Sequence, residues 1–200
     1  MPVAANGALE LKTQRFILRA LSAQSDTAAF QTWSQDPRLM GPMNLPARIL
    51  TASQVRDYWA GFDNQNRFFF GIFGADGAAA GFWLVECEPL HNIATFHIAI
   101  DPARQGQGCA LETGIALLDW LFAVRRIAKL NVLTLPDNAA LRALLARLGF
   151  TEEGVLRQEI RNLTGEGRLD QLRFGLLPTD WRAAREAVQE YFNVKFGKTT

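Results

Sequence analysis

Hydrophobic and polar residues alternate along several segments of the first half of the chain, a pattern typical of β-strands with two unlike faces. We predict strands at residues 15–21, 67–73, 80–87 and 93–100. The connection between the second and third of these strands is a short turn that contains two glycines. The last three predicted strands are therefore expected to form an antiparallel meander.

Between the first two predicted strands, apolar side chains recur at helical spacing. One helix runs through Phe30 and Trp33 and is expected to end at Pro37, because proline cannot continue a helix. A second helix is predicted at residues 51–62. Residues 38–50 between the two helices are interpreted as a loop with apolar contacts.

The second half of the chain changes to an order of strand, helix and strand. A glycine-rich turn leads into an apolar helix at residues 109–124 and a strand at 130–135, which predicts a parallel crossover. A helix that begins at Asn138 and a hairpin of strands at 151–161 and 168–177 follow. The predicted fold is mixed α/β (α+β), with a central, mostly antiparallel sheet and helices on both faces.

Composition and charge restrict the classes of partner. The 200 residues fit a single domain, and 21 basic against 20 acidic residues leave a net charge of +1, which favours neither nucleic acid nor an anionic membrane. Cys87 and Cys109 are too few for a disulfide framework, and no metal-ligand spacing surrounds them. Neither a secretory signal nor a run of about 18 apolar residues occurs. We therefore expect a cytoplasmic protein without a metal, and without a nucleic-acid or membrane partner.

The clearest candidate for chemistry is the turn that precedes the helix at residue 109. Its residues are Gln105, Gly106, Gln107, Gly108, Cys109 and Ala110. Glycine lets the main chain approach a phosphate closely, and the N–H groups that open a helix bind anions. A Walker loop is excluded because no Gly-Lys-Ser/Thr follows, and a dinucleotide fingerprint would need a third glycine. The alternative is a tight strand-to-helix joint that binds nothing.

The segment HIAIDPARQGQGCALETG resembles the acetyl-CoA signature of the GNAT superfamily, in which Gln or Arg, any two residues, Gly, any residue, then Gly or Ala surround the pyrophosphate. Gln105, Gly108 and Ala110 match this signature. LKTQRFILR and DNAALRALLARLGFTEEGVLR are similar to segments of its RimJ/RimL-type branch. The resemblance implies a GNAT domain at residues 9–181, a sheet splayed at the acetyl-CoA site, and a C-terminal helical extension at residues 182–200.

The same resemblance assigns the rest of the cofactor site. It implies that the pantetheine arm of acetyl-CoA runs beside Ile98 and Ile100, held by main-chain groups, and that Asn138 contacts the cofactor near the start of its helix. A plain helix cap is an equally good interpretation of Asn138. We expect the side chain to have both roles.

Acetyl transfer requires a neutral amine and therefore a proton acceptor. The RimJ/RimL branch often has an acid on the strand before the turn, where this chain has Thr95, and His97 follows on the same strand face. His97 is the candidate base, with packing as its alternative role, and Thr95 is its catalytic neighbour. The family usually draws the thiolate's proton donor from the next helix, but Leu141 and Leu145 occupy those positions.

The resemblance assigns acceptor selection to the segment between the first two helices and to the late hairpin. Trp33, Met40 and Met43 are the candidate acceptor-binding residues, and no acidic cluster nearby would attract a polyamine. The predicted function is N-acetyl transfer from acetyl-CoA to a primary amine of a small molecule or of a peptide or protein N-terminus. The alternative, favoured by the two leucines, is a catalytically degenerate GNAT domain that binds acyl-CoA as a sensor or partner module.

A last helix is predicted at residues 179–192. Trp181, Ala184, Val188 and Phe192 share one of its faces. So apolar a face is expected to be covered either by its own domain or by a second subunit. We favour the second subunit, which implies a homodimer.

Overall fold

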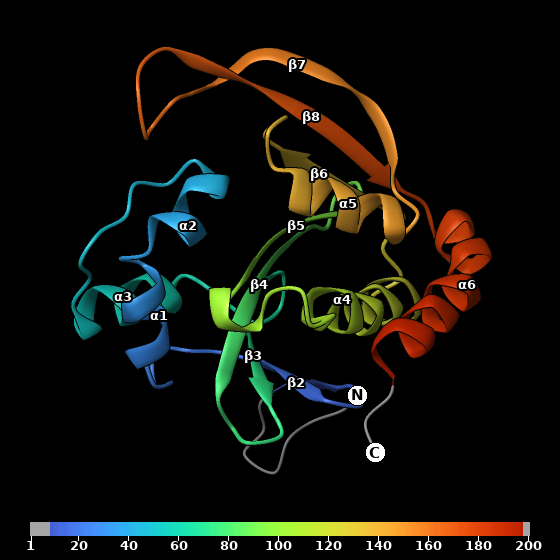
Figure 1. Cartoon of the computed structure of the whole chain (residues 1–200), viewed down its shortest axis with the longest axis horizontal. Helices are drawn as coiled ribbons and strands as arrows, with labels where there is room; N and C mark the ends of the chain where they lie inside the picture. The colour runs from blue at the N-terminus through green and yellow to red at the C-terminus, as the bar shows by residue number, and fades with distance from the viewer. Residues whose placement is uncertain (1–8, 198–200) are drawn as a thin grey trace.

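The computed structural model describes residues 9–197, whose strands form one eight-stranded sheet in the order β1-β2-β3-β4-β5-β6-β8-β7 (Figure 1). The strands are β1 (Glu10–Lys12), β2 (Phe16–Ala20), β3 (Arg67–Gly74), β4 (Ala79–Glu88), β5 (Ile93–Ile100), β6 (Lys129–Thr134), β7 (Thr151–Arg161) and β8 (Arg168–Leu176). Neighbouring strands are antiparallel, except that β5 and β6 are parallel. The predicted mixed, mostly antiparallel sheet and its parallel crossover are confirmed.

Helices cover both faces of the sheet, as predicted (Figure 1). One face carries α1 (Ala28–Trp33), α2 (Pro37–Met40), the 3-10 helix η1 (Gly41–Met43) and α3 (Ala52–Ala60). The other face carries α4 (Cys109–Asp119), its π-helical continuation η3 (Trp120–Val124), α5 (Ala139–Arg147) and α6 (Pro178–Phe196). A short 3-10 helix, η2 (Pro102–Arg104), joins β5 to the glycine turn. Among residues 9–197, no helix combines the length and the apolar character that crossing a membrane requires.

Alternating side chains of the strands build a core on each face of the sheet. In β3, Phe68 and Phe70 join the core beneath α4 and α5, whereas Phe69 joins the core beneath α1 and α3. Period-two alternation in the sequence therefore located these strands correctly. The strand β1 was not predicted, because its three residues are too few to show an alternating pattern.

The segment predicted as a loop at residues 38–50 contains two short helical elements, α2 and η1. Pro37 stands at the first position of α2, where its fixed φ suits a helix and its missing N–H costs nothing. Asp36 caps this helix, because its Oδ1 accepts a hydrogen bond from the backbone N–H of Arg38 at 2.9 Å. Elements of one turn leave no periodic pattern in the sequence, so the interpretation of this segment as a loop is corrected, whereas its expected apolar contacts are found at Leu39 and Met40.

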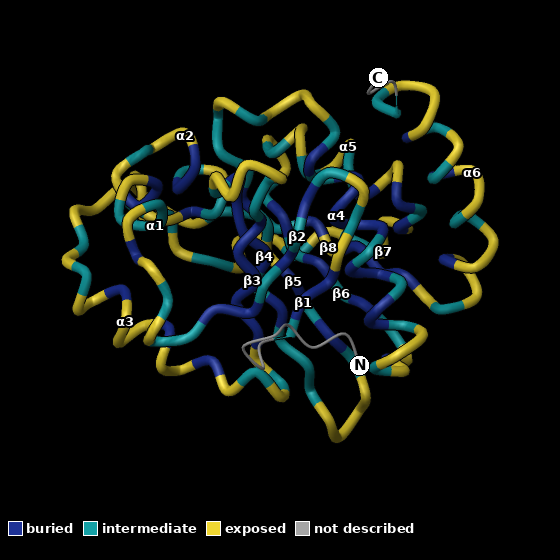
Figure 2. The backbone as a smooth tube through the Cα atoms, turned by 90° about the horizontal axis from the view of Figure 1, so that it is seen from below, coloured by how far each residue is buried: buried dark blue, intermediate teal, exposed yellow. Residues whose placement is uncertain are grey.

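The apolar face of α6 packs on its own domain, so the expectation that it covers a second subunit is wrong. Trp181, Val188 and Phe192 are at most 4% exposed and belong to the larger core. Trp181 Nε1 donates to Asp119 Oδ1 at 3.0 Å, and Arg185 forms an ion pair with Asp119 at 2.9 Å. Figure 2 shows buried and exposed residues alternating along α6. The other elements of the domain leave part of the larger core uncovered, and α6 covers that part. This face of α6 therefore gives no support for a homodimer.

Candidate active site

Strands β5 and β6 diverge part of the way along their length. Their parallel pairing ends at Thr95, which lies opposite Asn131, and residues 96–100 of β5 have no partner on β6. Unpaired strand edges present N–H and C=O groups that an extended ligand can bind. The fork therefore confirms the predicted splay of the sheet.

A cavity of about 510 Å³ opens at this fork. Its walls come from α2 and η1, the end of β5, the glycine turn, the start of α4, one side of α5 and the end of α6. A larger cavity of about 910 Å³ lies by α1, β2 and β3 and shares no lining residue with the glycine turn. We take the smaller cavity as the candidate active site, because it joins an anion-binding turn to an open strand edge.

Gly106 and Gly108 give the turn its shape. Both have left-handed backbones, with φ of 73° and 80°, which glycine adopts without strain. Gly108 is the N-cap residue of α4, and no side chain in residues 9–197 caps that helix. The first N–H groups of α4 therefore lack a side-chain acceptor, and the helix dipole favours an anion beside them. This geometry suits a pyrophosphate.

The two glutamine side chains of the turn bind the backbone that leads into it. Gln105 Nε2 donates to the carbonyl of Ile100 at 3.0 Å, and Gln107 Nε2 donates to the carbonyl of Ala103 at 2.9 Å. Both side chains thus hold the turn in shape. Any contact of these residues with phosphate would come from their backbone amides.

A buried carboxylate fixes the turn to the N-terminal segment. Glu112, only 5% exposed, accepts hydrogen bonds from Thr13 Oγ1 at 2.7 Å and from the backbone N–H of Arg15 at 2.7 Å. Arg15 forms an ion pair with Glu112 at 2.6 Å, and its Nη2 donates to the carbonyl of Gln107 at 2.9 Å. Sequence reasoning missed Thr13 and Arg15, because nothing in the local pattern indicates contacts with Glu112 from 99 and 97 positions away.

Ile98, Ile100 and Asn138, the remaining predicted cofactor residues, all line the cavity. Asn138 caps α5, because its Oδ1 accepts from the backbone N–H of Leu141 at 3.1 Å. Its Nδ2 lies 3.4 Å from the carbonyl of Pro42 and so links α5 to η1. The capping role is therefore observed, whereas contact with the cofactor stays a prediction.

The two predicted catalytic residues lie on β5 where its pairing with β6 ends, and neither of them lines the cavity. Thr95 is the last residue of β5 that pairs with β6, and His97 follows on the same strand face. The imidazole is exposed to solvent, yet the protein packed around it lowers the pKa of His97 below its ordinary value of 6.5. The Glu86 carboxylate, on the strand residue opposite Thr95, partly offsets this effect. His97 is therefore mainly neutral near pH 7, as a base must be.

No proton donor occupies the two positions on α5 that the resemblance assigns to one. Leu141 lines the cavity, and Leu145 is fully buried in the larger core. Cys109 also lines the cavity, but burial raises the pKa of its thiol to about 12. The thiol is therefore protonated and inert as a nucleophile at neutral pH, and Cys109 packs as a small residue of the larger core.

The three predicted acceptor residues are distributed over two environments. Met43 lines the cavity, whereas Trp33 and Met40 are buried in the core beneath α1 and α3. Trp33 Nε1 donates to Asp101 Oδ2 at 2.7 Å, so this side chain joins α1 to the end of β5. Helical spacing alone did not separate core positions from cavity walls.

The two segments to which acceptor selection was assigned are tied together by Asn44. This residue follows η1 in a left-handed conformation, with φ of 56°, and is 5% exposed. Its Nδ2 donates to the carbonyl of Arg161 at 2.7 Å, and its Oδ1 accepts from the backbone N–H of Leu163 at 2.9 Å. The hairpin of β7 and β8 thus reaches across the molecule to the segment that contains α2 (Figure 1).

Comparison with known sequences adds independent evidence. The family model described as an acetyltransferase (GNAT) domain matches residues 15–151. Uncharacterized N-acetyltransferase YoaA of Bacillus subtilis is 27% identical over 154 residues, which cover 74% of this chain and 86% of that protein. Spermidine N(1)-acetyltransferase of Escherichia coli K12 is 34% identical over 98 residues, which cover 48% of this chain and 52% of that enzyme.

Solved structures share the fold at low sequence identity. Spermidine N-acetyltransferase from Vibrio cholerae, in complex with CoA and spermine, aligns with a TM-score of 0.75 and 21% identity over 84% of this chain and 98% of that chain. RimL, the ribosomal L7/L12 alpha-N-protein acetyltransferase, aligns with a TM-score of 0.75 and 20% identity over 88% and 98% of the two chains. At these identities the likeness establishes the fold alone.

Proposed function

The chain belongs to the GNAT family of acetyltransferases and takes its acetyl group from acetyl-CoA; on that premise, we propose that it acetylates a primary amine at the fork between β5 and β6. The observation that carries this proposal is the continuity of one cavity from the uncapped N-terminus of α4 to the unpaired edge of β5. The turn at Gly106 and Gly108 binds the pyrophosphate, and the edge at Ile98 and Ile100 binds the pantetheine arm.

His97 acts as the base in this proposal. The amine nitrogen attacks the thioester carbonyl carbon, the C–N bond forms as the C–S bond breaks, and the proton lost by the amine passes to His97 directly or through water. The thiolate takes its proton from solvent, since Leu141 and Leu145 have none to give, and His97 returns the proton of the amine to solvent. Thr95 holds a water molecule beside the imidazole.

We propose that the acceptor carries a single amine, as a small molecule or a peptide or protein N-terminus does. The acceptor enters at the end of the cavity formed by Pro42 and Met43, where Arg38 is the charged lining residue. No carboxylate of residues 9–197 lines this cavity, so a polycationic acceptor finds no opposite charge there. A polyamine is therefore the weaker acceptor in this proposal.

The branch of the family and the cellular compartment of the protein are part of the same proposal. We assign it to the RimJ/RimL-type branch on the sequence segments that resemble it, and to the cytoplasm, where the free thiols of Cys87 and Cys109 would stay reduced. Its partners are then acetyl-CoA and the amine acceptor. The division into a GNAT domain at residues 9–181 and a helical extension from residue 182 stays a prediction.

A matched pair of glycine variants tests the location of the cofactor. Gly106→Val places a side chain in the open space over the turn, because a Cβ there meets no atom within 4 Å. Gly77, in the turn between β3 and β4, has a similar φ of 74° and equally open surroundings. Gly77→Val therefore imposes the same backbone strain away from the active-site cavity. We expect calorimetry to show acetyl-CoA binding at least about tenfold weaker for Gly106→Val alone. Equal affinities in the two folded variants would refute the site.

A further inference from the structure

The end of α6 forms part of the wall of the active-site cavity. Tyr191, Lys195 and Phe196 all line it, although the matched family model ends at residue 151. A Cβ added to Gly108 would lie 2.7 Å from the Phe196 ring, so that ring rests directly on the glycine turn. The C-terminal helix is thus a component of the cofactor site as well as a cover for the core.

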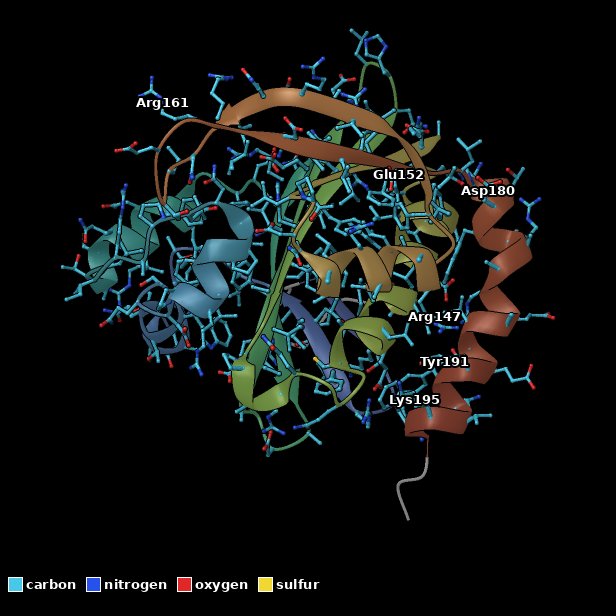
Figure 3. The ribbon with its side chains drawn as sticks, turned by 45° about the horizontal axis from the view of Figure 1, so that its top comes forward. Arg147, Glu152, Arg161, Asp180, Tyr191 and Lys195 are labelled. Atoms are coloured by element: carbon cyan, nitrogen blue, oxygen red, sulfur yellow. The ribbon has the colours of Figure 1, made fainter. Side chains whose placement is uncertain are left out.

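Two basic residues meet on the aromatic ring of Tyr191. The guanidinium carbon of Arg147, at the end of α5, lies 3.7 Å from the ring centroid, and Lys195 Nζ donates to the Tyr191 hydroxyl at 3.1 Å. Figure 3 shows the three residues together where the lower part of α6 faces α4 and α5. A guanidinium stacks on an aromatic ring through its face, so the N–H donors in its plane are left for an anion.

Charge is neutralised unequally around the cavity. Its basic lining residues are Arg38, Arg104, Arg147 and Lys195. Arg38 pairs with Asp36 at 2.7 Å and Arg104 with Asp76 at 3.1 Å. Neither Arg147 nor Lys195 forms an ion pair with a carboxylate of residues 9–197. The end of the cavity at α6 therefore retains uncompensated positive charge.

The position of this charge indicates which part of a ligand it meets. Arg147 lies about 13 Å along the α5 axis from Asn138, at a rise of about 1.5 Å per residue. Asn138 contacts Pro42 at the acceptor end, so Arg147 and Lys195 mark the opposite end. The turn proposed to bind the pyrophosphate lies against Phe196, the residue that follows Lys195. A ligand that reaches Arg147 and Lys195 must extend beyond its pyrophosphate, away from the acetyl group.

We propose that Arg147 and Lys195, joined through Tyr191, bind the 3′-phosphate on the ribose of coenzyme A, so that α6 makes the enzyme selective for the phosphorylated nucleotide. This inference rests on the proposed function, because it assumes that the pyrophosphate occupies the glycine turn. A phosphate monoester carries nearly two negative charges at neutral pH and accepts charge-assisted hydrogen bonds from both side chains. Tyr191 is a positioning residue that fixes the spacing of the two cations.

The test compares acetyl-CoA with acetyl-dephospho-CoA, which lacks only the 3′-phosphate, by calorimetry on the full chain. We expect the wild type to bind acetyl-CoA about tenfold more tightly. Arg147→Ala and Lys195→Ala should each weaken acetyl-CoA binding several-fold and leave acetyl-dephospho-CoA binding unchanged. Arg182→Ala is the matched control, because it removes the same charge from an exposed position of α6 that does not line the cavity.

The possible failures of this inference and of the proposed function differ. If the wild type binds both cofactors equally, α6 does not recognise the 3′-phosphate. The inference is then overturned, and the proposed function is unaffected. If Arg147→Ala and Lys195→Ala weaken both cofactors alike, the residues support the fold of the site and the inference is again overturned. If the folded wild type binds neither cofactor, the proposed function fails and takes the inference with it.

Discussion

The ring of Phe196, near the end of α6, lies against Gly108, the left-handed glycine that opens α4. Residues 88 positions apart in sequence are thus in contact at the glycine turn. A side chain at position 108 would meet two obstacles, because φ there is 80° and a Cβ would lie 2.7 Å from the ring. The conformation of the turn and the docking of α6 are therefore coupled.

This coupling can be measured in a double-mutant cycle. We expect Gly108→Ala to lower the free energy of unfolding by about 1–3 kcal/mol, through backbone strain and overlap with Phe196. In a Phe196→Ala background the overlap is gone and only the backbone strain remains. Urea unfolding of the four proteins should give a coupling energy of about 1 kcal/mol. Additive effects would mean that the two residues do not touch in solution.

The pH dependence of the rate tests the role of His97. A base must be neutral to act, and the pKa of His97 lies below 6.5, so activity should fall with acid in a limb centred below pH 6.5. His97→Gln should lose that limb and most of the rate, typically about 100-fold or more. Glu86 raises the pKa of His97, so Glu86→Gln should move the limb to still lower pH. A wild-type limb that persists in His97→Gln would assign the base elsewhere.

Two buried carboxylates in similar ion pairs provide a matched test of whether Glu112 supports cofactor binding at the glycine turn. Glu112 pairs with Arg15 at 2.6 Å next to the turn, and Glu10 pairs with Arg19 at 2.6 Å between β1 and β2, with no hydrogen bond from this pair to the turn. Either change to Gln should lower the free energy of unfolding by about 2 kcal/mol. Only Glu112→Gln should also raise the KM for acetyl-CoA, because Arg15 then holds the carbonyl of Gln107 less firmly. An equal effect of both variants on KM would contradict a specific role of Glu112.

Asn44 is expected to affect the acceptor more than the cofactor. Asn44→Gly keeps the left-handed backbone conformation but removes both hydrogen bonds to the β7–β8 hairpin. Steady-state kinetics should show a KM for the amine raised several-fold and a KM for acetyl-CoA changed less than about twofold. The reverse pattern would mean that the hairpin serves the cofactor instead.

Local patterns predicted the parts of the structure that depend on neighbouring residues. Alternation located the strands of the meander, and glycine spacing located the left-handed turn at Gly106 and Gly108, because a strand face and a left-handed turn are specified within a few residues. The cap of α5 by Asn138 belongs to the same group, since the side chain binds the N–H three residues on.

Contacts between distant segments could not be predicted in this way. The ion pair of Arg15 with Glu112, the contact of Phe196 with Gly108, and the burial of Met40 all depend on which elements the fold places side by side. The apolar face of α6 was recognised, but its partner was misassigned, because periodicity shows that a face must be buried and not what covers it.

The most direct test of the account is the release of free thiol from acetyl-CoA by the full chain, followed with a panel of monoamines, N-terminal peptides and polyamines. We predict saturable, amine-dependent release with a monoamine or a peptide N-terminus, weaker release with spermidine, and loss of the signal in Gly106→Val but not in Gly77→Val. If the protein binds acetyl-CoA in calorimetry yet no amine increases thiol release above the rate without amine, transfer at this fork is contradicted.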